Sequence, residues 1–200
     1  MDDETNVQRH GAAAFLSLDR MFVEGGVLAA FAKRLDIYYA RRGDIAQNVA
    51  ERYRDSVSLI RSLAEVAVER GYKPVIVSCA PDFLVDAVVK GIEVYGLLAT
   101  EYETAVDGKF TGKIKTNLGQ PEVRRDVVRK FSNNMGFDQS KSAYFADSIL
   151  DIRVLGDIGH MYVIEPEGEF RRMVEENRFI ILNKDNAIET VERTLPNLRK

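Results

Sequence analysis

Two aspartates, Asp147 and Asp151, lie four residues apart in the stretch 143–155. They follow a short apolar run, 143–146, that is typical of a buried strand, and apolar residues return beyond them at helical spacing. A carboxylate at the end of a strand and another one helical turn later can face one point, where hard oxygen ligands would suit Mg²⁺. The alternative is that Asp147 caps the following helix and Asp151 is an ordinary surface acid.

Two earlier apolar runs also end in polar residues. The first ends in Ser17 and Asp19, and the second ends in Ser78, which Cys79 follows. In an open parallel sheet, ligands collect at the carboxyl ends of the strands. We therefore expect these residues to lie beside the two aspartates of the first stretch.

Apolar runs alternate with helical patterns along the chain, which indicates an α/β fold with an open, mainly parallel sheet. The expected strands lie within 12–19, 73–78, 92–104, 142–146, 161–164 and 178–181, with a small hairpin around 107–113. The expected helices span 22–34, 37–70, 80–90, 121–136 and 167–176.

Composition narrows the class of protein. The chain has 200 residues, 46% of them hydrophobic, which is enough for one full core. Its 28 basic and 31 acidic residues are well mixed and give a net charge of −3, which argues against a nucleic-acid or anionic-membrane surface. Its one cysteine excludes an intrachain disulfide. The acidic first residues are unlike a signal peptide, and no apolar run approaches the ~20 residues of a membrane span, so we expect a soluble, cytoplasmic domain.

Two segments resemble motifs of one family. Residues 77–81 read Val-Ser-Cys-Ala-Pro and residues 146–151 read Ala-Asp-Ser-Ile-Leu-Asp. They resemble the second and fourth motifs of the haloacid dehalogenase (HAD) superfamily, most closely its phosphoserine-phosphatase-like branch, with alanine for the usual glycine in the later motif. The resemblance implies a Rossmannoid core domain of residues 1–21 and 72–200, with a small helical cap, 22–71, inserted after the first strand.

The resemblance also implies roles for individual residues. Ser78, with Cys79 beside it, would bind the phosphate or another ligand, and Asp19, Asp147 and Asp151 would hold the metal. A buried structural cysteine is the alternative for Cys79. For the acids, the alternative is that they persist as caps and loop acceptors without a metal.

The first motif departs from the family pattern. The family has Asp-x-Asp-x-Thr, whereas residues 17–21 read Ser-Leu-Asp-Arg-Met. The first aspartate of the family attacks the phosphate and ligates Mg²⁺. Ser17, at this nucleophile position, has a hydroxyl with a pKa far above neutrality and no evident base, and one fewer carboxylate should weaken the metal site. Asp19 fits the second aspartate, which protonates the leaving group, and Met21 cannot replace the threonine hydroxyl.

The third motif departs as well. The family has a lysine near the start of the helix before the fourth motif, and overlaying its pattern on 119–123 puts Glu122 at the lysine position. A carboxylate there would repel a phosphate. Lys113 or Lys115, in the preceding segment, is a weaker alternative source of positive charge.

These departures lead to two functional hypotheses. The first is a pseudoenzyme: a HAD-fold, phosphatase-like protein without the usual phosphoaspartate mechanism, used for binding, regulation or a different reaction. The second is an active Mg²⁺-dependent phosphomonoesterase or phosphotransferase acting on a small phosphorylated metabolite. On the first hypothesis Mg²⁺ binds weakly or not at all. The expected partner is a small phosphorylated metabolite or a protein, neither nucleic acid nor membrane, and the cap could support a homodimer.

Overall fold

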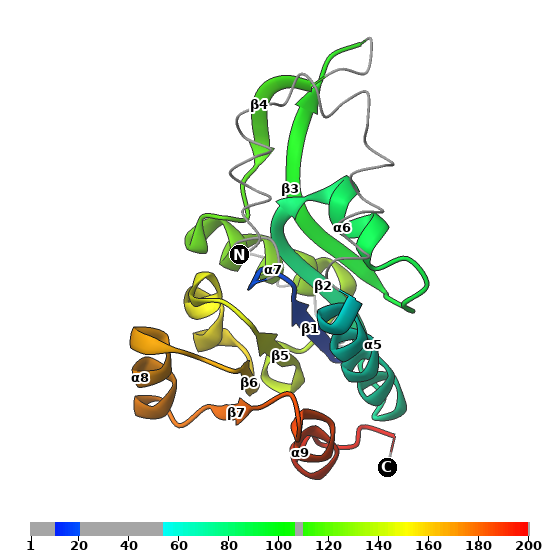
Figure 1. Ribbon diagram of the computed structural model, residues 1–200. Coiled ribbons are helices and arrows are strands. Elements are labelled where there is room, and N and C mark those ends of the chain that lie inside the picture. The colour runs from blue at the N-terminus through cyan, green and yellow to red at the C-terminus, as the bar shows by residue number, and fades with distance from the viewer. Residues whose placement is uncertain (1–10, 21–53, 107–109, 200) are drawn as a thin grey trace, which may run out of the picture.

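The computed structural model describes residues 11–20, 54–106 and 110–199, which form one seven-stranded sheet with helices on both faces (Figure 1). The strand order is β4-β3-β2-β1-β5-β6-β7, and only β3 and β4 pair antiparallel. The predicted α/β fold with an open, mainly parallel sheet is confirmed. The strands are β1 (Ala13–Ser17), β2 (Lys73–Pro81), β3 (Gly96–Thr104), β4 (Phe110–Thr116), β5 (Ala143–Ala146), β6 (His160–Ile164) and β7 (Ile180–Leu182). The helices are α5 (Arg54–Glu69), α6 (Asp82–Val88), α7 (Pro121–Met135), α8 (Gly168–Glu176) and α9 (Ala187–Thr194), with short 3-10 turns η2 (Gln139–Lys141), η3 (Ile149–Arg153) and η4 (Leu155–Asp157).

The central strand β1 is buried on both faces, because its alternate side chains point into two different helix layers. Ala14 and Leu16 belong to the apolar cluster that α5, α6 and α9 cover. Ala13 and Phe15 belong to the cluster that α7 and α8 cover. The polar residues that follow β1 therefore emerge only at the carboxyl edge of the sheet.

Helix α5 belongs to the core rather than to a separate cap. Its apolar stripe, which includes Ile60, Leu63 and Ala67, is buried in the same cluster as β1 and β2. The predicted cap, 22–71, therefore includes α5, a helix that packs in the core. The rest of the predicted cap, 22–53, lies outside the described residues, as do the predicted helix 22–34 and the first part of the helix 37–70.

The predicted hairpin is present as β3 and β4, which extend beyond the rest of the sheet (Figure 1). Its exposed ion pairs cross between the strands, from Lys115 to Glu101 and from Lys113 to Glu103. The alternative that Lys113 or Lys115 supplies the positive charge of the missing motif lysine is therefore not supported, since each pairs with a glutamate of the hairpin.

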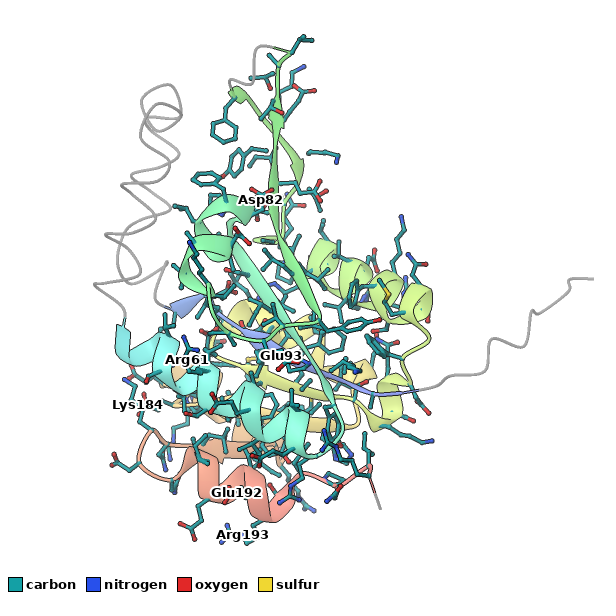
Figure 2. The ribbon with its side chains drawn as sticks, turned by 90° about the vertical axis from the view of Figure 1, so that its right-hand side faces the viewer. Arg61, Asp82, Glu93, Lys184, Glu192 and Arg193 are labelled. Atoms are coloured by element: carbon teal, nitrogen blue, oxygen red, sulfur yellow. The ribbon has the colours of Figure 1, made fainter. Side chains whose placement is uncertain are left out.

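Two arginines join α5 to the C-terminal segment. Arg70, just after α5, donates to the backbone carbonyls of Glu192 and Leu195 at the end of α9. Arg199 donates in turn to the carbonyl of Val68 in α5, at 2.6 Å. Carbonyls in the last turn of a helix have no intrahelical partner, so each cation caps the end of the other helix. Figure 2 shows α5 above α9, where Glu192 is labelled. None of the helices that the structure describes is long and apolar enough to cross a bilayer.

We predict that Arg70→Ala lowers the free energy of unfolding by about 1–3 kcal/mol, because it leaves the part-buried Leu195 carbonyl and the exposed Glu192 carbonyl without this donor. Urea denaturation followed by circular dichroism measures the change. Arg172→Ala, on the exposed face of α8, is the matched control and should change stability by less than about 0.5 kcal/mol. Equal effects of the two substitutions would contradict the capping role.

Candidate functional site

The structure brings together polar residues from the ends of β1, β2 and β5 at the carboxyl edge of the sheet. Ser17 is the last residue of β1 and lies beside Val77, next to the Ser78 of β2. Asp147 follows β5 directly, and Asp151 lies in η3. The predicted convergence of these side chains with Asp19 is therefore observed. We call this group of side chains the carboxylate pocket.

Asp147 is held by donors from the end of β1. Its Oδ1 accepts a hydrogen bond from the Ser17 hydroxyl at 2.8 Å. Its Oδ2 accepts from the backbone N–H groups of Asp19, at 2.9 Å, and Arg20, at 3.1 Å. The alternative role as a helix cap is wrong, because the Ser148 hydroxyl caps η3 by accepting from the Leu150 N–H.

Asp19 is fully buried and bound to the motif at the end of β2. Its Oδ1 accepts from the backbone N–H of Cys79 at 2.6 Å and lies 3.2 Å from the Ser78 hydroxyl, which also donates to the Leu18 carbonyl. The Cys79 thiol is buried, and burial followed by the charge of Asp19 raises its pKa far above the usual value. Cys79 therefore stays a neutral thiol, and only its backbone serves the pocket.

The cation of the pocket is Arg124, a residue that the sequence analysis did not identify. It lies one turn into α7 and is fully buried. Its Nη1 is 2.5 Å from both Asp19 Oδ2 and Asp151 Oδ1, and its Nε donates to the Leu118 carbonyl at 3.0 Å. Tyr144 of β5 also donates to Asp151 Oδ1, at 2.6 Å. Asp151 is therefore a fully buried acceptor of two donors, not a surface acid.

Glu122 does not occupy the pocket, contrary to the prediction from the motif overlay. It is exposed in the first turn of α7, whereas Arg124, Val128 and Ser132 share the buried face of that helix. Two residues correspond to about 200° around a helix, so Glu122 and Arg124 face opposite sides. The spacing of Arg124 and Val128, four residues apart on one stripe, was the sequence signal for a buried cation.

The carboxylates of the pocket shift one another's ionisation. One oxygen each of Asp19, Asp147 and Asp151 lies within 4.8 Å of the others. Burial, followed by the charges of Asp19 and Asp151, raises the pKa of Asp147 from 3.8 to about 7. Burial also raises the pKa of Asp151, although Arg124 opposes that shift. For Arg124, burial disfavours the charged form, but the charges of Asp151 and Asp19 win and raise its pKa above the usual value.

The three carboxylates could hold a cation, although Arg124 already pairs with two of them. Asp151 Oδ2 is buried with no hydrogen-bond partner among the described residues, and Asp19 Oδ2 contacts only the Arg124 guanidinium at 2.5 Å. Carboxylate oxygens of this kind suit Mg²⁺. The ion would be held by Asp19, Asp147 and Asp151. It would compete with Arg124 for Asp19 and Asp151.

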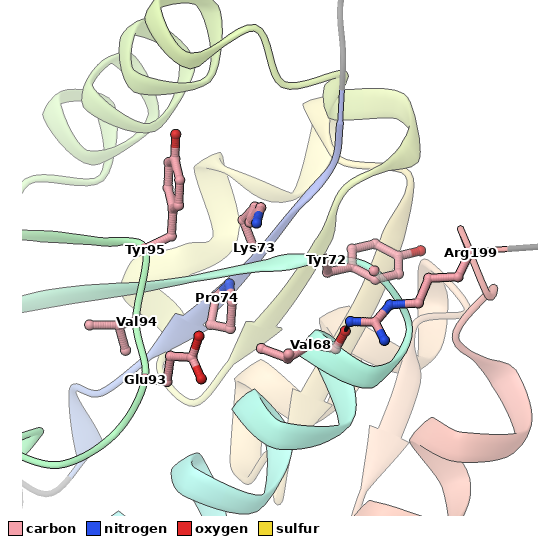
Figure 3. Close-up of a pocket in the computed structure, with 9 residues that line it drawn as sticks. Val68, Tyr72, Lys73, Pro74, Glu93, Val94, Tyr95 and Arg199 are labelled. Atoms are coloured by element: carbon pink, nitrogen blue, oxygen red, sulfur yellow. Dashed lines mark hydrogen bonds between the residues drawn. The ribbon is translucent and has the colours of Figure 1, made fainter.

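Two surface hollows lie outside the carboxylate pocket. One, of about 160 Å³, is lined by Lys73, Tyr95 and Arg199 among others (Figure 3). The second, of about 290 Å³, lies between α5 and the segment after α6. The first lies at the amino end of β2, and neither hollow is lined by Asp19, Asp147 or Asp151.

A profile of the haloacid dehalogenase-like hydrolase family matches residues 5–156, which is more than half of the chain. The chain belongs to this family. The superfamily predicted from the motifs is thus confirmed.

Known proteins are similar at low identity. The "Inhibition of morphological differentiation protein" of Streptomyces azureus is 24% identical over 184 residues, covering 86% of this chain and 66% of that protein. A phosphoserine phosphatase of Mycobacterium tuberculosis is 23% identical over 116 residues, covering 58% of this chain and 37% of that protein. The chain thus spans about a third to two thirds of the curated relatives it matches.

Solved structures share the fold. A protein of unknown function from Bordetella pertussis has a TM-score of 0.64 at 16% identity, over 87% of this chain and 99% of the other. A phosphoserine phosphatase in its apo form has a TM-score of 0.60 at 13% identity, over 93% of this chain and 100% of the other. The fold is therefore that of the phosphoserine phosphatases, as the sequence predicted.

We predict that stability in a metal chelator falls as the pH rises. Asp147 has a pKa of about 7 in the folded protein, against 3.8 in its ordinary state, so the folded state binds more protons between these values. The stabilisation is complete below about pH 4 and is lost as the pH rises through about 7. Urea unfolding should show a loss of about 2 kcal/mol between about pH 5 and about pH 8.

Asp147→Asn keeps the side-chain shape without a titrating group and should flatten most of this dependence. Asp138→Asn, in an acid that caps η2 away from the pocket, is the control and should keep it. A stability that rises over this pH range in the unmodified protein would contradict the assigned shift.

Proposed function

We propose that this protein binds a small phosphorylated metabolite in the pocket of Asp19, Ser78, Arg124 and Asp147, without the phosphoaspartate chemistry of its family. The observation that carries the proposal is the Ser17 hydroxyl, which aligns with the nucleophile of the family motif and donates a hydrogen bond to Asp147 Oδ1 at 2.8 Å. The family nucleophile is an ionised carboxylate at neutral pH. A hydroxyl engaged as a donor is a neutral and much weaker nucleophile.

The pocket retains what a phosphate needs for binding. Arg124 supplies a guanidinium, the side chain best suited to pair with phosphate oxygens. Its Nη2 is fully buried and has no hydrogen-bond partner in the described part of the chain. The Ser78 hydroxyl and the Cys79 N–H both contact Asp19, the carboxylate that pairs with Arg124. The positive charge that the sequence analysis considered lost is therefore present, which favours a binding role over a wholly degraded site.

A second candidate function is phosphomonoester hydrolysis through Ser17. Its support is the same Ser17–Asp147 hydrogen bond, because Asp147 is a carboxylate in place to take the serine proton. In that reaction the Ser17 oxygen would form a bond to phosphorus and the phosphate–alcohol bond would break. Asp147 would receive the serine proton and pass it to the leaving alcohol. Water would then attack the phosphoserine, which releases inorganic phosphate and restores the Ser17 hydroxyl.

Mg²⁺ binding in this proposal is weak. When bound, the ion polarises a phosphate oxygen. Here one carboxylate of the family set is missing at Ser17, and Arg124 already neutralises Asp19 and Asp151. Both differences lower the affinity of the site for a divalent cation.

The remaining partner assignments are also proposals. The near balance of basic and acidic residues argues against a nucleic-acid or anionic-membrane partner, and we propose that the protein is cytoplasmic. A protein partner is the alternative to the metabolite. A homodimer is compatible with either partner.

We predict that Ser17→Asp gains phosphatase activity in the presence of Mg²⁺, by about 100-fold or more over the unmodified protein. With Glu122 at the lysine position, a carboxylate would have opposed the phosphate in this variant. Because Arg124 and not Glu122 faces the pocket, the restored carboxylate has its cation, its metal ligands and its phosphate site. The measurement is hydrolysis of p-nitrophenyl phosphate.

Ser17→Asn, which matches the size of aspartate without its charge, is the control and should stay inactive. If Ser17→Asp binds phosphate yet remains inactive, the pocket lacks more than a nucleophile. If the unmodified protein hydrolyses the ester and Ser17→Ala does not, the serine reaction replaces the binding proposal.

We predict that calorimetry of the unmodified protein gives a dissociation constant for Mg²⁺ of about 1 mM or weaker. Arg124→Met should bind Mg²⁺ at least about tenfold more tightly, because the two carboxylates lose their internal counter-ion. Arg125→Met, at the neighbouring part-exposed arginine, is the control and should not change the affinity. Micromolar binding to the unmodified protein would contradict the competition between Arg124 and the metal.

A further inference from the structure

Thr100, in β3, is a buried hydroxyl outside every recognised motif. The pairing of β2 with β3 shifts register between Val77 and Pro81, so the strand ladder skips residues 78–80, which include Ser78 and Cys79. The Thr100 hydroxyl fills this gap by donating to the Cys79 carbonyl at 2.7 Å. A side chain therefore fixes the part of β2 that the sheet itself does not hold.

The same hydroxyl accepts a hydrogen bond from the Leu118 N–H at 3.2 Å. Leu118 is fully buried, between β4 and α7, and its carbonyl accepts from Arg124 Nε at 3.0 Å. Both backbone polar groups of Leu118 are thus used, one toward Thr100 and one toward the pocket cation. A buried residue whose N–H and C=O are both hydrogen-bonded can move little without losing one of these bonds.

These contacts close into a ring. From Thr100 it runs through Leu118 to Arg124, then through Asp19 to Cys79 and back to Thr100. All five residues are buried. Hydrogen bonds in such a buried ring polarise one another, so loss of one bond weakens the others.

We propose that Thr100 is the positioning residue for Arg124. It sets the place of the guanidinium through the Leu118 peptide, and it connects the base of the β3–β4 hairpin to the pocket. The effect on ligand binding rests on the function proposed above, whereas the effect on the guanidinium does not. Thr100 touches no ligand itself, so it acts on phosphate only through Arg124 and the Cys79 backbone.

The test compares Thr100→Val, which keeps the shape but removes the hydroxyl, with Thr100→Ser, which keeps the hydroxyl. Thr111→Val is the matched control, because Thr111 is an exposed threonine of the same hairpin whose hydroxyl bonds to Glu103. The first readout is the Arg124 Nε–H resonance in a proton–nitrogen spectrum, identified by its loss in Arg124→Lys. The second readout is the affinity for inorganic phosphate.

In Thr100→Val the Arg124 resonance should shift and its hydrogen exchange should quicken by about tenfold or more, since the Leu118 peptide loses its anchor. Thr100→Ser and Thr111→Val should keep the resonance and its protection. Phosphate binding should weaken by about tenfold in Thr100→Val alone.

An unchanged resonance and protection in folded Thr100→Val overturns the proposal. So does a serine variant that behaves like the valine variant, because a purely steric role would not be rescued by the hydroxyl. If phosphate binds none of the proteins, the proposed function fails, and the resonance still decides the role of Thr100.

Discussion

The pairing of one buried guanidinium with a group of buried carboxylates is the interaction on which the pocket depends. Arg124 Nη1 lies 2.5 Å from oxygens of both Asp19 and Asp151, and all three side chains are fully buried. Removing one member of such a group leaves an uncompensated buried charge, which is far more costly than the pair itself is stabilising. The surrounding strands and helices have to hold these charges at contact distance.

The fold meets this constraint by bringing each charge from a separate element. Asp19 follows β1, Asp147 follows β5, and Arg124 faces inward from the first turns of α7. The Leu118 peptide and the Thr100 hydroxyl then connect the helix to the sheet. The site is therefore distributed over the chain, yet each member is fixed by backbone or side-chain hydrogen bonds rather than by a flexible loop.

The sequence predicted those parts of the structure that local pattern determines. Apolar runs buried on both faces marked β1 and β5, and the polar residues at their ends predicted where Ser17 and Asp147 would meet. Arg124 was missed because motif overlay, not helix phase, was used to place the cation, and overlay selected Glu122 on the opposite side of α7. Thr100 could not have been predicted, because its role arises from a register shift between two strands.

The pKa shifts of the site could not be predicted from the sequence either. The raised pKa of Asp147 follows from burial beside Asp19 and Asp151, a consequence of tertiary contacts that no spacing in the chain reveals. Likewise, the boundary between core and cap depends on where α5 packs. A helical pattern shows that a face is apolar but not which surface covers it.

The most direct test of the central claim is whether phosphate binds without a covalent step. The unmodified protein would be mixed with Mg²⁺ and p-nitrophenyl phosphate, and followed by phosphorus NMR for binding and by intact mass after acid quenching for phosphorylation. We predict broadening or a shift of the phosphate ester resonance with no phosphorylated protein and no release of nitrophenol. A protein that gains the mass of one phosphoryl group, on Ser17 or on Asp19, would contradict this account.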